Sequence, residues 1–260
     1  MGVLNITPDS FSDGGCFTTK SEAIRQAELM TRQGASIIDI GGESTRPGAT
    51  PVSIDEELHR VIPVIEAIRS KSNMVISIDT SKPEVMKQAV GAGADIINDV
   101  FALRQPGALE MAASLKVPVC LMHMQSTPET MQHNPRYSNV IDEVKAFFEE
   151  RINACEKADI EKSKIILDPG FGFGKKLEHN LSLLANLETF KSYGCPLLVG
   201  LSRKSMFGDL LGKSVNERAL ASVTAALLAV INGASIVRVH DVQETFDALK
   251  IYNAAQSLNL

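Results

Sequence analysis

Short apolar segments alternate with longer segments of helical periodicity along the whole chain. The apolar segments are rich in β-branched residues, which is typical of strands buried on both faces of a parallel sheet. Their regular alternation with helical segments indicates repeated β-α units. We predict eight strands, at Gly2–Ile6, Ser36–Gly41, Met74–Asp79, Asp95–Val100, Val117–Met122, Lys164–Asp168, Leu197–Gly200 and Ser235–Val239.

Eight strands that are each followed by a helix favour an α/β fold, a closed TIM (β/α)8 barrel, with an open doubly wound sheet as the alternative. The 260 residues, 44% of them apolar, suit a single barrel domain over residues 1–260. Residue pairs with capping-box spacing predict several helix starts. These pairs are Thr19/Glu22, Ser53/Glu56, Ser81/Glu84 and Ser214/Glu217, with an acidic version at Asp241/Glu244.

An internal repeat places polar residues at the ends of predicted strands. Three segments share the pattern G-A-x-I-[I/V]-polar, and the strand before Asp168 continues the series; the polar residues are Asp39, Asn98, Asp168 and Arg238. Barrel interiors are filled in layers by alternate strands, so we expect these four side chains near one level at the carboxyl mouth. Such a cluster is either a buried ion-pair network or a polar binding site, and we favour the binding site.

The segment Ile165–Lys175 combines a carboxylate, three glycines and two aromatic rings. Pro169 cannot continue a strand ladder, and the glycines allow backbone to pass close to a bound molecule. Phe171 and Phe173 offer flat apolar surface beside Asp168. These groups together suit a planar, nitrogen-rich heterocycle, although a plain strand-end turn is the alternative.

Composition excludes some classes of protein. The net charge of −5, from 26 basic and 31 acidic residues, argues against nucleic acid as the main partner. The four cysteines lack a C-x-x-C pair, which is typical of free thiols in a reducing compartment. The longest apolar run, Ala219–Ile231, is too short to span a membrane, so we expect a cytoplasmic protein. That helix is apolar on more than one face, which predicts a homodimer through the last helices or a wedge between barrel neighbours.

Eight sequence blocks, in order along practically the whole chain, resemble dihydropteroate synthase. They are N-I-T-P-D-S-F-S-D-G-G (5–15), G-G-E-S-T-R-P-G-A (41–49), S-I-D-T-S-K-P (77–83), I-I-N-D (96–99), L-M-H-M (121–124), L-D-P-G-F-G-F-G-K (167–175), G-L-S-R-K-S (200–205) and R-V-H-D (238–241). The resemblance implies a TIM-barrel transferase of folate biosynthesis. Such an enzyme joins 7,8-dihydropterin-6-ylmethyl diphosphate to p-aminobenzoate, giving 7,8-dihydropteroate and diphosphate, with Mg²⁺.

The resemblance also implies roles for individual residues. The pterin contacts fall on Asp79, Asn98, Asp168 and Lys204, with Arg238 stacked on the ring and Met122, Val100 and Phe173 as apolar walls. The diphosphate contacts fall on Asn5, Thr45, Arg46, Arg238 and His240, with Asn5 also as the protein ligand of Mg²⁺. The p-aminobenzoate pocket, which sulfonamides would compete for, falls on Phe11, Pro47, Lys204 and Ser205. Asn5, Lys204, Arg238 and His240 are the expected catalytic residues.

Three other functions remain open at this point. The pterin-binding domain of methyltetrahydrofolate methyltransferases is similar in its Asp/Asn/Asp set, although the S-R-K-S and N-I-T-P-D-S-F blocks favour the synthase. A Schiff-base lyase could use Lys204, and a non-catalytic paralogue could bind pterin without turnover. Members of the family usually begin with a β-hairpin ahead of the first strand. This sequence starts on that strand, so we expect either that the hairpin is lacking or that the true start lies upstream.

Overall fold

The computed structural model describes residues 1–6, 16–44, 50–126, 131 and 134–257, with side chains from residue 20 onward in the first helix. Its eight strands all run parallel. They are β1 (Gly2–Asn5), β2 (Ile37–Gly41), β3 (Val75–Asp79), β4 (Ile96–Asp99), β5 (Val119–Met122), β6 (Ile165–Asp168), β7 (Leu198–Val199) and β8 (Ile236–Val237). Each predicted strand is present and is one to three residues shorter than predicted.

The strands close into a barrel. β1 to β6 pair in sequence order, and β7 pairs with β8. Parallel bridges from Leu167 to Leu197 and from Gly2 to Val239 join the two groups, and the N–H of Val3 donates to the carbonyl of Val239 at 3.0 Å. The closed barrel predicted from the sequence is therefore confirmed over the open sheet.

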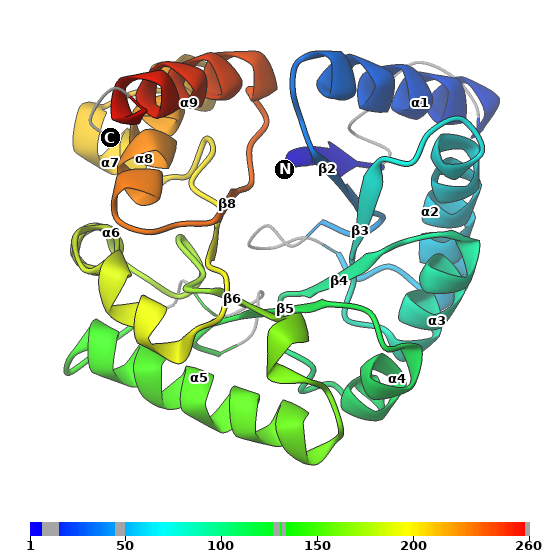
Figure 1. The fold of residues 1–260 in the computed structure, drawn as a ribbon, viewed down its shortest axis with the longest axis horizontal. Helices are drawn as coiled ribbons and strands as arrows, with labels where there is room; N and C mark the ends of the chain where they lie inside the picture. The colour runs from blue at the N-terminus through cyan, green and yellow to red at the C-terminus, as the bar shows by residue number, and fades with distance from the viewer. Residues whose placement is uncertain (7–15, 45–49, 127–130, 132–133, 258–260) are drawn as a thin grey trace.

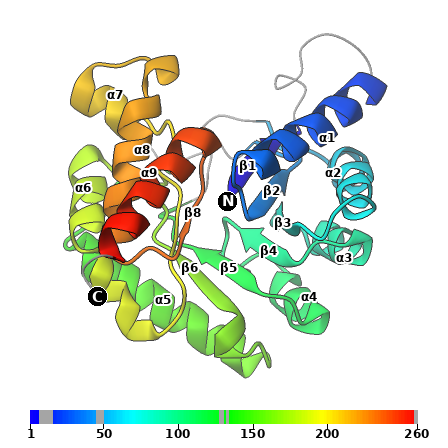
Figure 2. The same ribbon diagram turned by 45° about the horizontal axis from the view of Figure 1, so that its top comes forward.

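Helices surround the barrel in chain order (Figure 1). They are α1 (Cys16–Arg32), α2 (Ile54–Arg69), α3 (Pro83–Ala92), α4 (Ala108–Leu115), α5 (Val140–Lys157), α6 (Leu177–Ala185), α7 (Met206–Leu211), α8 (Ala219–Ile231) and α9 (Val242–Gln256), with short 3-10 helices η2 (Lys162–Lys164), η3 (Leu187–Tyr193) and η4 (Val215–Glu217). Two views place α7, α8 and α9 together on one side (Figures 1 and 2). No helix in the described part of the chain is long and apolar enough to cross a membrane.

The interior of the barrel explains the sequence repeat. Ile96, Cys120, Ile166 and Leu198 form a buried cluster, with Ile37 and Ile236 packed against it. Side chains two positions apart on a strand face the same way, so the polar residue of each repeat lies directly above the interior isoleucine. The repeat thus encodes one apolar layer at the bottom of the barrel and one polar layer at its carboxyl mouth.

Two of the predicted helix caps are wrong. α1 begins at Cys16, so Thr19 lies inside it. α3 begins at Pro83 with Lys82 as its N-cap, because proline suits the first helical position and its fixed φ displaces the cap from Ser81. The cap at Ser53 is confirmed, since its side chain accepts from the N–H of Glu56 at 3.2 Å.

Candidate active site

The carboxyl ends of the first four strands bring polar groups into one row. Register aligns Asn5 with Gly41, Gly41 with Asp79, and Asp79 with Asn98. Gly41 has no side chain, and a Cβ there would lie 3.5 Å from Oδ1 of Asn5 and 3.5 Å from Cβ of Asp79. The glycine therefore leaves open the space between the amide and the carboxylate.

Arg238 bridges two carboxylates across the mouth. Its Nε donates to Oδ2 of Asp39 at 2.6 Å, and its Nη2 donates to Oδ2 of Asp79 at 2.7 Å. Burial opposes the charge on Arg238, yet the two carboxylates raise its pKa above the usual value. Burial raises the pKa of Asp79 to about 7, although the guanidinium beside it lowers that pKa. The cluster therefore holds a permanent cation beside a carboxyl group that titrates near neutral pH.

Asp39 sets the orientation of Asn98. It is fully buried, and its Oδ2 accepts from Nδ2 of Asn98 at 3.2 Å. Because a carboxylate only accepts, the amide nitrogen of Asn98 faces Asp39 and the amide oxygen faces away from it. The sequence repeat predicted Asp39 as one of four residues of a polar binding site; in the structure Asp39 is the hydrogen-bond partner that positions both Asn98 and Arg238.

Asp168 lies at the end of β6 and begins the glycine-rich turn. Its Oδ1 accepts from the N–H of Gly170 at 2.7 Å, and its carbonyl accepts from the N–H of His123 at 2.8 Å. Burial raises the pKa of Asp168, against the lowering effects of the Gly170 N–H and of Lys204 and Lys175. The carboxylate is thus held by backbone with cations nearby, which suits it to accept hydrogen bonds from a ligand.

Apolar side chains form a wall beside these polar groups. Val100, Met122 and Met124 make one buried cluster, against which Phe173 packs. Nζ of Lys204 lies 4.1 Å from the centre of the Phe173 ring, within the range of a cation–π contact. The predicted apolar residues and the predicted lysine therefore come together on one side of the mouth.

The ends of β7 and β8 carry further polar contacts. Nδ1 of His240 lies 3.0 Å from Oγ of Ser202, which also accepts from the N–H of His240 at 3.1 Å. Nη2 of Arg203 forms an ion pair with Oδ1 of Asp241 at 2.5 Å. Ser205 is exposed at the N-terminus of α7. The predicted residues Phe11, Thr45, Arg46 and Pro47 lie outside the described part of the chain.

Two lysines near the site, the buried Lys175 and the partly buried Lys82, were not predicted from the sequence. Lys175 is 3% exposed and contacts His123, and burial lowers its pKa to about 7 although Asp168 raises it. Lys82 pairs with Glu43 at 2.7 Å and with the fully buried Glu57 at 2.5 Å. Both lysines could have been found from their positions in the motif blocks. Lys175 follows the glycine-rich turn, and Lys82 follows the end of β3.

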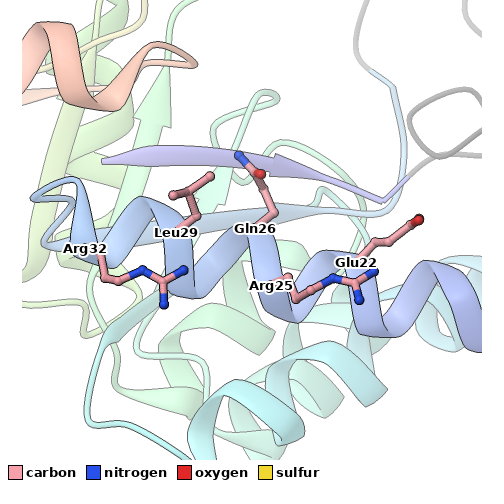
Figure 3. Close-up of a pocket in the computed structure, with 5 residues that line it drawn as sticks. All are labelled: Glu22, Arg25, Gln26, Leu29 and Arg32. Carbon is pink, nitrogen blue, oxygen red and sulfur yellow. The ribbon is translucent and has the colours of Figure 1, made fainter.

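Two surface hollows lie away from this cluster. One, of about 450 Å³, lies along α1 and is lined by Glu22, Arg25, Gln26, Leu29 and Arg32 (Figure 3). The other, of about 460 Å³, lies between α9 and the amino ends of β1, β2 and β8. Their linings include none of the predicted site residues, so neither hollow is the predicted site.

Comparison with known proteins agrees with this geometry. The family model described as "Pterin binding enzyme" matches residues 1–240. The chain belongs to the pterin binding enzyme family. Dihydropteroate synthase of Escherichia coli (strain K12) is 55% identical over 257 residues, which are 99% of this chain and 91% of that protein.

Solved structures of the pterin binding enzyme family share the whole fold. A crystal structure of Yersinia pestis dihydropteroate synthase with a sulfonamide drug complex has 51% identity and a TM-score of 0.94, covering 99% of this chain and 94% of that one. Dihydropteroate synthase from Xanthomonas albilineans in complex with 7,8-dihydropteroate has 49% identity and a TM-score of 0.90, covering 98% of this chain and 92% of that one. The TIM barrel predicted from the sequence is thus shared along practically the whole chain.

Proposed function

We propose that the chain is a transferase of folate biosynthesis that forms 7,8-dihydropteroate. The C–O bond between the pterin methylene and the diphosphate breaks, and its electron pair leaves with the diphosphate. The amine nitrogen of p-aminobenzoate forms the new C–N bond and loses one proton to solvent. The high identity to dihydropteroate synthases and the mouth cluster support this reaction together.

One observation carries the proposal: three oxygen acceptors meet at the mouth beside an apolar wall. Asp79, the amide oxygen of Asn98 and Asp168 are suited to accept from the ring N–H and exocyclic amine of a dihydropterin. Met122 and Phe173 would cover one face of the flat ring. Arg238, held by Asp39 and Asp79, would stack on the ring and reach toward its diphosphate.

Stabilisation of the departing diphosphate is the main catalytic contribution in this scheme. Negative charge grows on the leaving oxygens, so cationic and N–H donors aimed at them lower the barrier. Arg238 and His240 are the described residues proposed for this role, together with Thr45 and Arg46. Lys204 carries a second cation beside the ring, over Phe173. No covalent intermediate on the protein is needed.

We propose Mg²⁺ as an ion that the site would share with the substrate. The described residues include no group of three or more His, Cys, Asp or Glu side chains that could hold a metal. Asn5 offers a half-buried amide oxygen at the mouth, and a hard cation that keeps most of its waters needs few protein ligands. Asn5 would therefore hold the ion with the diphosphate oxygens. When bound, Mg²⁺ supplies charge neutralisation on those oxygens.

The aromatic amine would bind next to the pterin methylene. Lys204 and Ser205 follow β7 at the edge of the mouth. Phe11 and Pro47, which lie outside the described residues, are proposed as the other members of this pocket. Sulfonamides resemble p-aminobenzoate in shape and charge, so they would compete for the same pocket. The sulfonamide complex of the Yersinia pestis enzyme supports this.

A homodimer through the last helices extends the proposal. Leu220, Leu228 and Ile231 form an apolar stripe on α8 and are 80%, 43% and 50% exposed. Their spacing places them on one face, opposite the buried Ala225 and Ala229. An exposed apolar stripe of this kind fits burial against a second copy better than a helix wedged between neighbours. A cytoplasmic location is consistent with the buried free thiols of Cys120, Cys155 and Cys195.

A turnover assay with both substrates tests the proposed function. We expect diphosphate release from 7,8-dihydropterin-6-ylmethyl diphosphate that depends on p-aminobenzoate, is inhibited by a sulfonamide and forms dihydropteroate. Binding of the pterin without turnover would instead favour a non-catalytic paralogue. Transfer of a methyl group from methyltetrahydrofolate would favour the methyltransferase, and trapping of Lys204 by borohydride with a carbonyl substrate would favour a Schiff-base lyase.

A further inference from the structure

Lys175 ends the glycine-rich turn after β6 and points into the protein. Its Nζ donates to the carbonyl oxygens of Gly170 at 2.9 Å and Phe173 at 3.0 Å, which belong to the same turn. It also donates to the carbonyl oxygen of His123 at 3.3 Å and lies 2.9 Å from Nδ1 of that residue, directly after β5. One ammonium group therefore joins the turn after β6 to the end of β5.

These contacts use the full donor capacity of the ammonium form of Lys175. Burial lowers the pKa of this group to about 7, and the carbonyl oxygens around Nζ favour the charged form against that burial. An ammonium group has three donors and no acceptor, and here it faces four acceptor atoms. His123 accepts through Nδ1 because its ring is neutral: burial, with Lys175 and Arg104, lowers the pKa of His123 to about 2. A buried charge that is satisfied by carbonyl dipoles is costly to place, which argues that the position serves more than packing.

The groups that Lys175 contacts are those that hold the proposed ring-binding residues. Gly170, whose carbonyl binds Lys175, donates its N–H to the carboxylate of Asp168. His123 donates its N–H to the carbonyl of Asp168, and Phe173 carries the ring under Lys204. A shift of the turn would therefore move the Asp168 carboxylate and the Phe173 ring together.

The backbones that Lys175 joins are already in close approach. Gly170 has φ +70°, and a Cβ built on it would lie 1.9 Å from the carbonyl oxygen of His123. Two carbonyl oxygens that accept from the same ammonium group lie close enough to repel each other, and the cation offsets that repulsion. Lys175 supplies this cation, since both carbonyls accept from its Nζ.

We propose that Lys175 is a positioning residue for pterin binding, which fixes Asp168 and Phe173 by tying the turn after β6 to the end of β5. The inference rests on the proposed function for the identity of the ligand. The hydrogen bonds that tie the turn to the end of β5 do not depend on that function. Lys175 is too deeply buried to contact the ligand, so it acts on pterin binding through the turn.

The test compares Lys175→Met with Lys164→Met as a matched control. Lys164 also donates its Nζ to a backbone carbonyl, that of Lys116 at 2.8 Å, but it precedes β6 at the other end of the barrel. We expect Lys175→Met to weaken binding of 7,8-dihydropterin-6-ylmethyl diphosphate by about 10-fold or more, because Asp168 and Phe173 are no longer held in place. KM for p-aminobenzoate should change less than KM for the pterin, and Lys164→Met should leave both unchanged.

Hydrogen exchange of the ligand-free proteins tests the tether without any ligand. The N–H of Gly170 bonds to Asp168, and the N–H of Phe173 bonds to the carbonyl of Gly170 at 3.1 Å. Both amides should exchange faster in Lys175→Met than in the wild type or Lys164→Met. If the wild type fails to bind the pterin while this acceleration is present, the proposed function fails and the tether stands.

Two results would overturn the inference. A folded Lys175→Met that binds the pterin as well as the wild type, with unchanged exchange at Gly170 and Phe173, would contradict it. A variant that unfolds as a whole would also contradict it, because the proposed role is confined to the turn. Lys175→Gln, which keeps an uncharged donor, should lie between the wild type and Lys175→Met in pterin affinity.

Discussion

At the scale of single residues, the mouth of the barrel is built from groups that constrain one another. Asp39 is buried and binds both Asn98 and Arg238, so its charge is satisfied within the protein. Asp79 and Asp168 are also buried, but each has an oxygen atom that is suited to a ligand N–H. Pre-organised acceptors of this kind recognise a donor-rich ring edge at little reorganisation cost.

Replacement of Asp168 tests its role as an acceptor. In Asp168→Asn the amide oxygen can still accept from the N–H of Gly170, so the turn should persist. The lost negative charge should raise KM for the pterin diphosphate about 10- to 100-fold, as expected for one charge-assisted hydrogen bond. Asp159→Asn, an exposed residue ahead of β6, is the control and should behave as the wild type in steady-state kinetics. Unchanged KM in Asp168→Asn would argue against the contact.

The pKa of Asp79 predicts a pH dependence of stability. Burial raises this pKa to about 7, against an ordinary value near 3.8, so between these values the folded protein holds a proton that the unfolded chain has lost. The contribution of Asp79 to stability is therefore fully present below about pH 4 and is lost as the pH rises through about 7. Asn is neutral throughout this range.

Urea unfolding of the wild type and of Asp79→Asn from pH 4.5 to 7.5 measures this contribution directly. The free energy of unfolding of the wild type minus that of the variant should fall as the pH rises. A difference that rises with pH would mean that the ion pair with Arg238 outweighs burial and keeps the carboxylate charged.

At the scale of elements, the short apolar, β-branched runs predicted all eight strands, and the repeated G-A-x-I-[I/V]-polar pattern predicted the polar layer at the mouth. Both follow from local periodicity, since residues two apart on a strand share a face. The tether at Lys175 could not be predicted, because it depends on the meeting of the β6 turn with the end of β5. The cap at Ser81 was wrong because Pro83 fixes the start of α3 by itself. Residues that act through distant backbone leave little local signal.

Two glycines with the same backbone conformation test the close approach at β5. Gly170 and Gly194 have φ +70° and +68°, but a Cβ on Gly194 would meet nothing within 4 Å. Gly194→Ala should cost about 1–2 kcal/mol of stability from backbone strain alone. Gly170→Ala should cost more and should also reduce pterin binding, because its Cβ collides with the carbonyl of His123. If Gly170→Ala and Gly194→Ala had equal effects on the free energy of unfolding and on pterin affinity, the close approach of Gly170 to His123 would be contradicted.

At the scale of the whole molecule, the two ends and the rim of the barrel have different roles. The bottom is filled by an apolar layer, and the mouth carries the proposed ligand groups. The helices α7, α8 and α9 lie together on one side (Figure 1), and α8 exposes the apolar side chains of Leu220, Leu228 and Ile231. This division agrees with the general placement of chemistry at the carboxyl ends of barrel strands. It leaves the side surface available for association without obstructing the mouth.

Sedimentation equilibrium tests that association. The wild type should sediment as a dimer at micromolar concentration, and Leu220→Glu should shift it to a monomer, since a charge in the centre of an apolar interface is costly to bury. Leu29→Glu, at a 40% exposed leucine on α1, is the control and should remain dimeric. A wild type that sediments as a monomer would contradict the proposed dimer and would not bear on the proposed pterin site.

The most direct test of the central claim is a crystal structure of the protein with 7,8-dihydropterin-6-ylmethyl diphosphate bound. We predict that the ring lies in the mouth of the barrel, with its N–H groups on Asp79, Asn98 and Asp168 and its diphosphate toward Arg238 and His240. A ring bound at the amino ends of the strands, or at the mouth without contact to these three acceptors, would contradict the proposed pterin site.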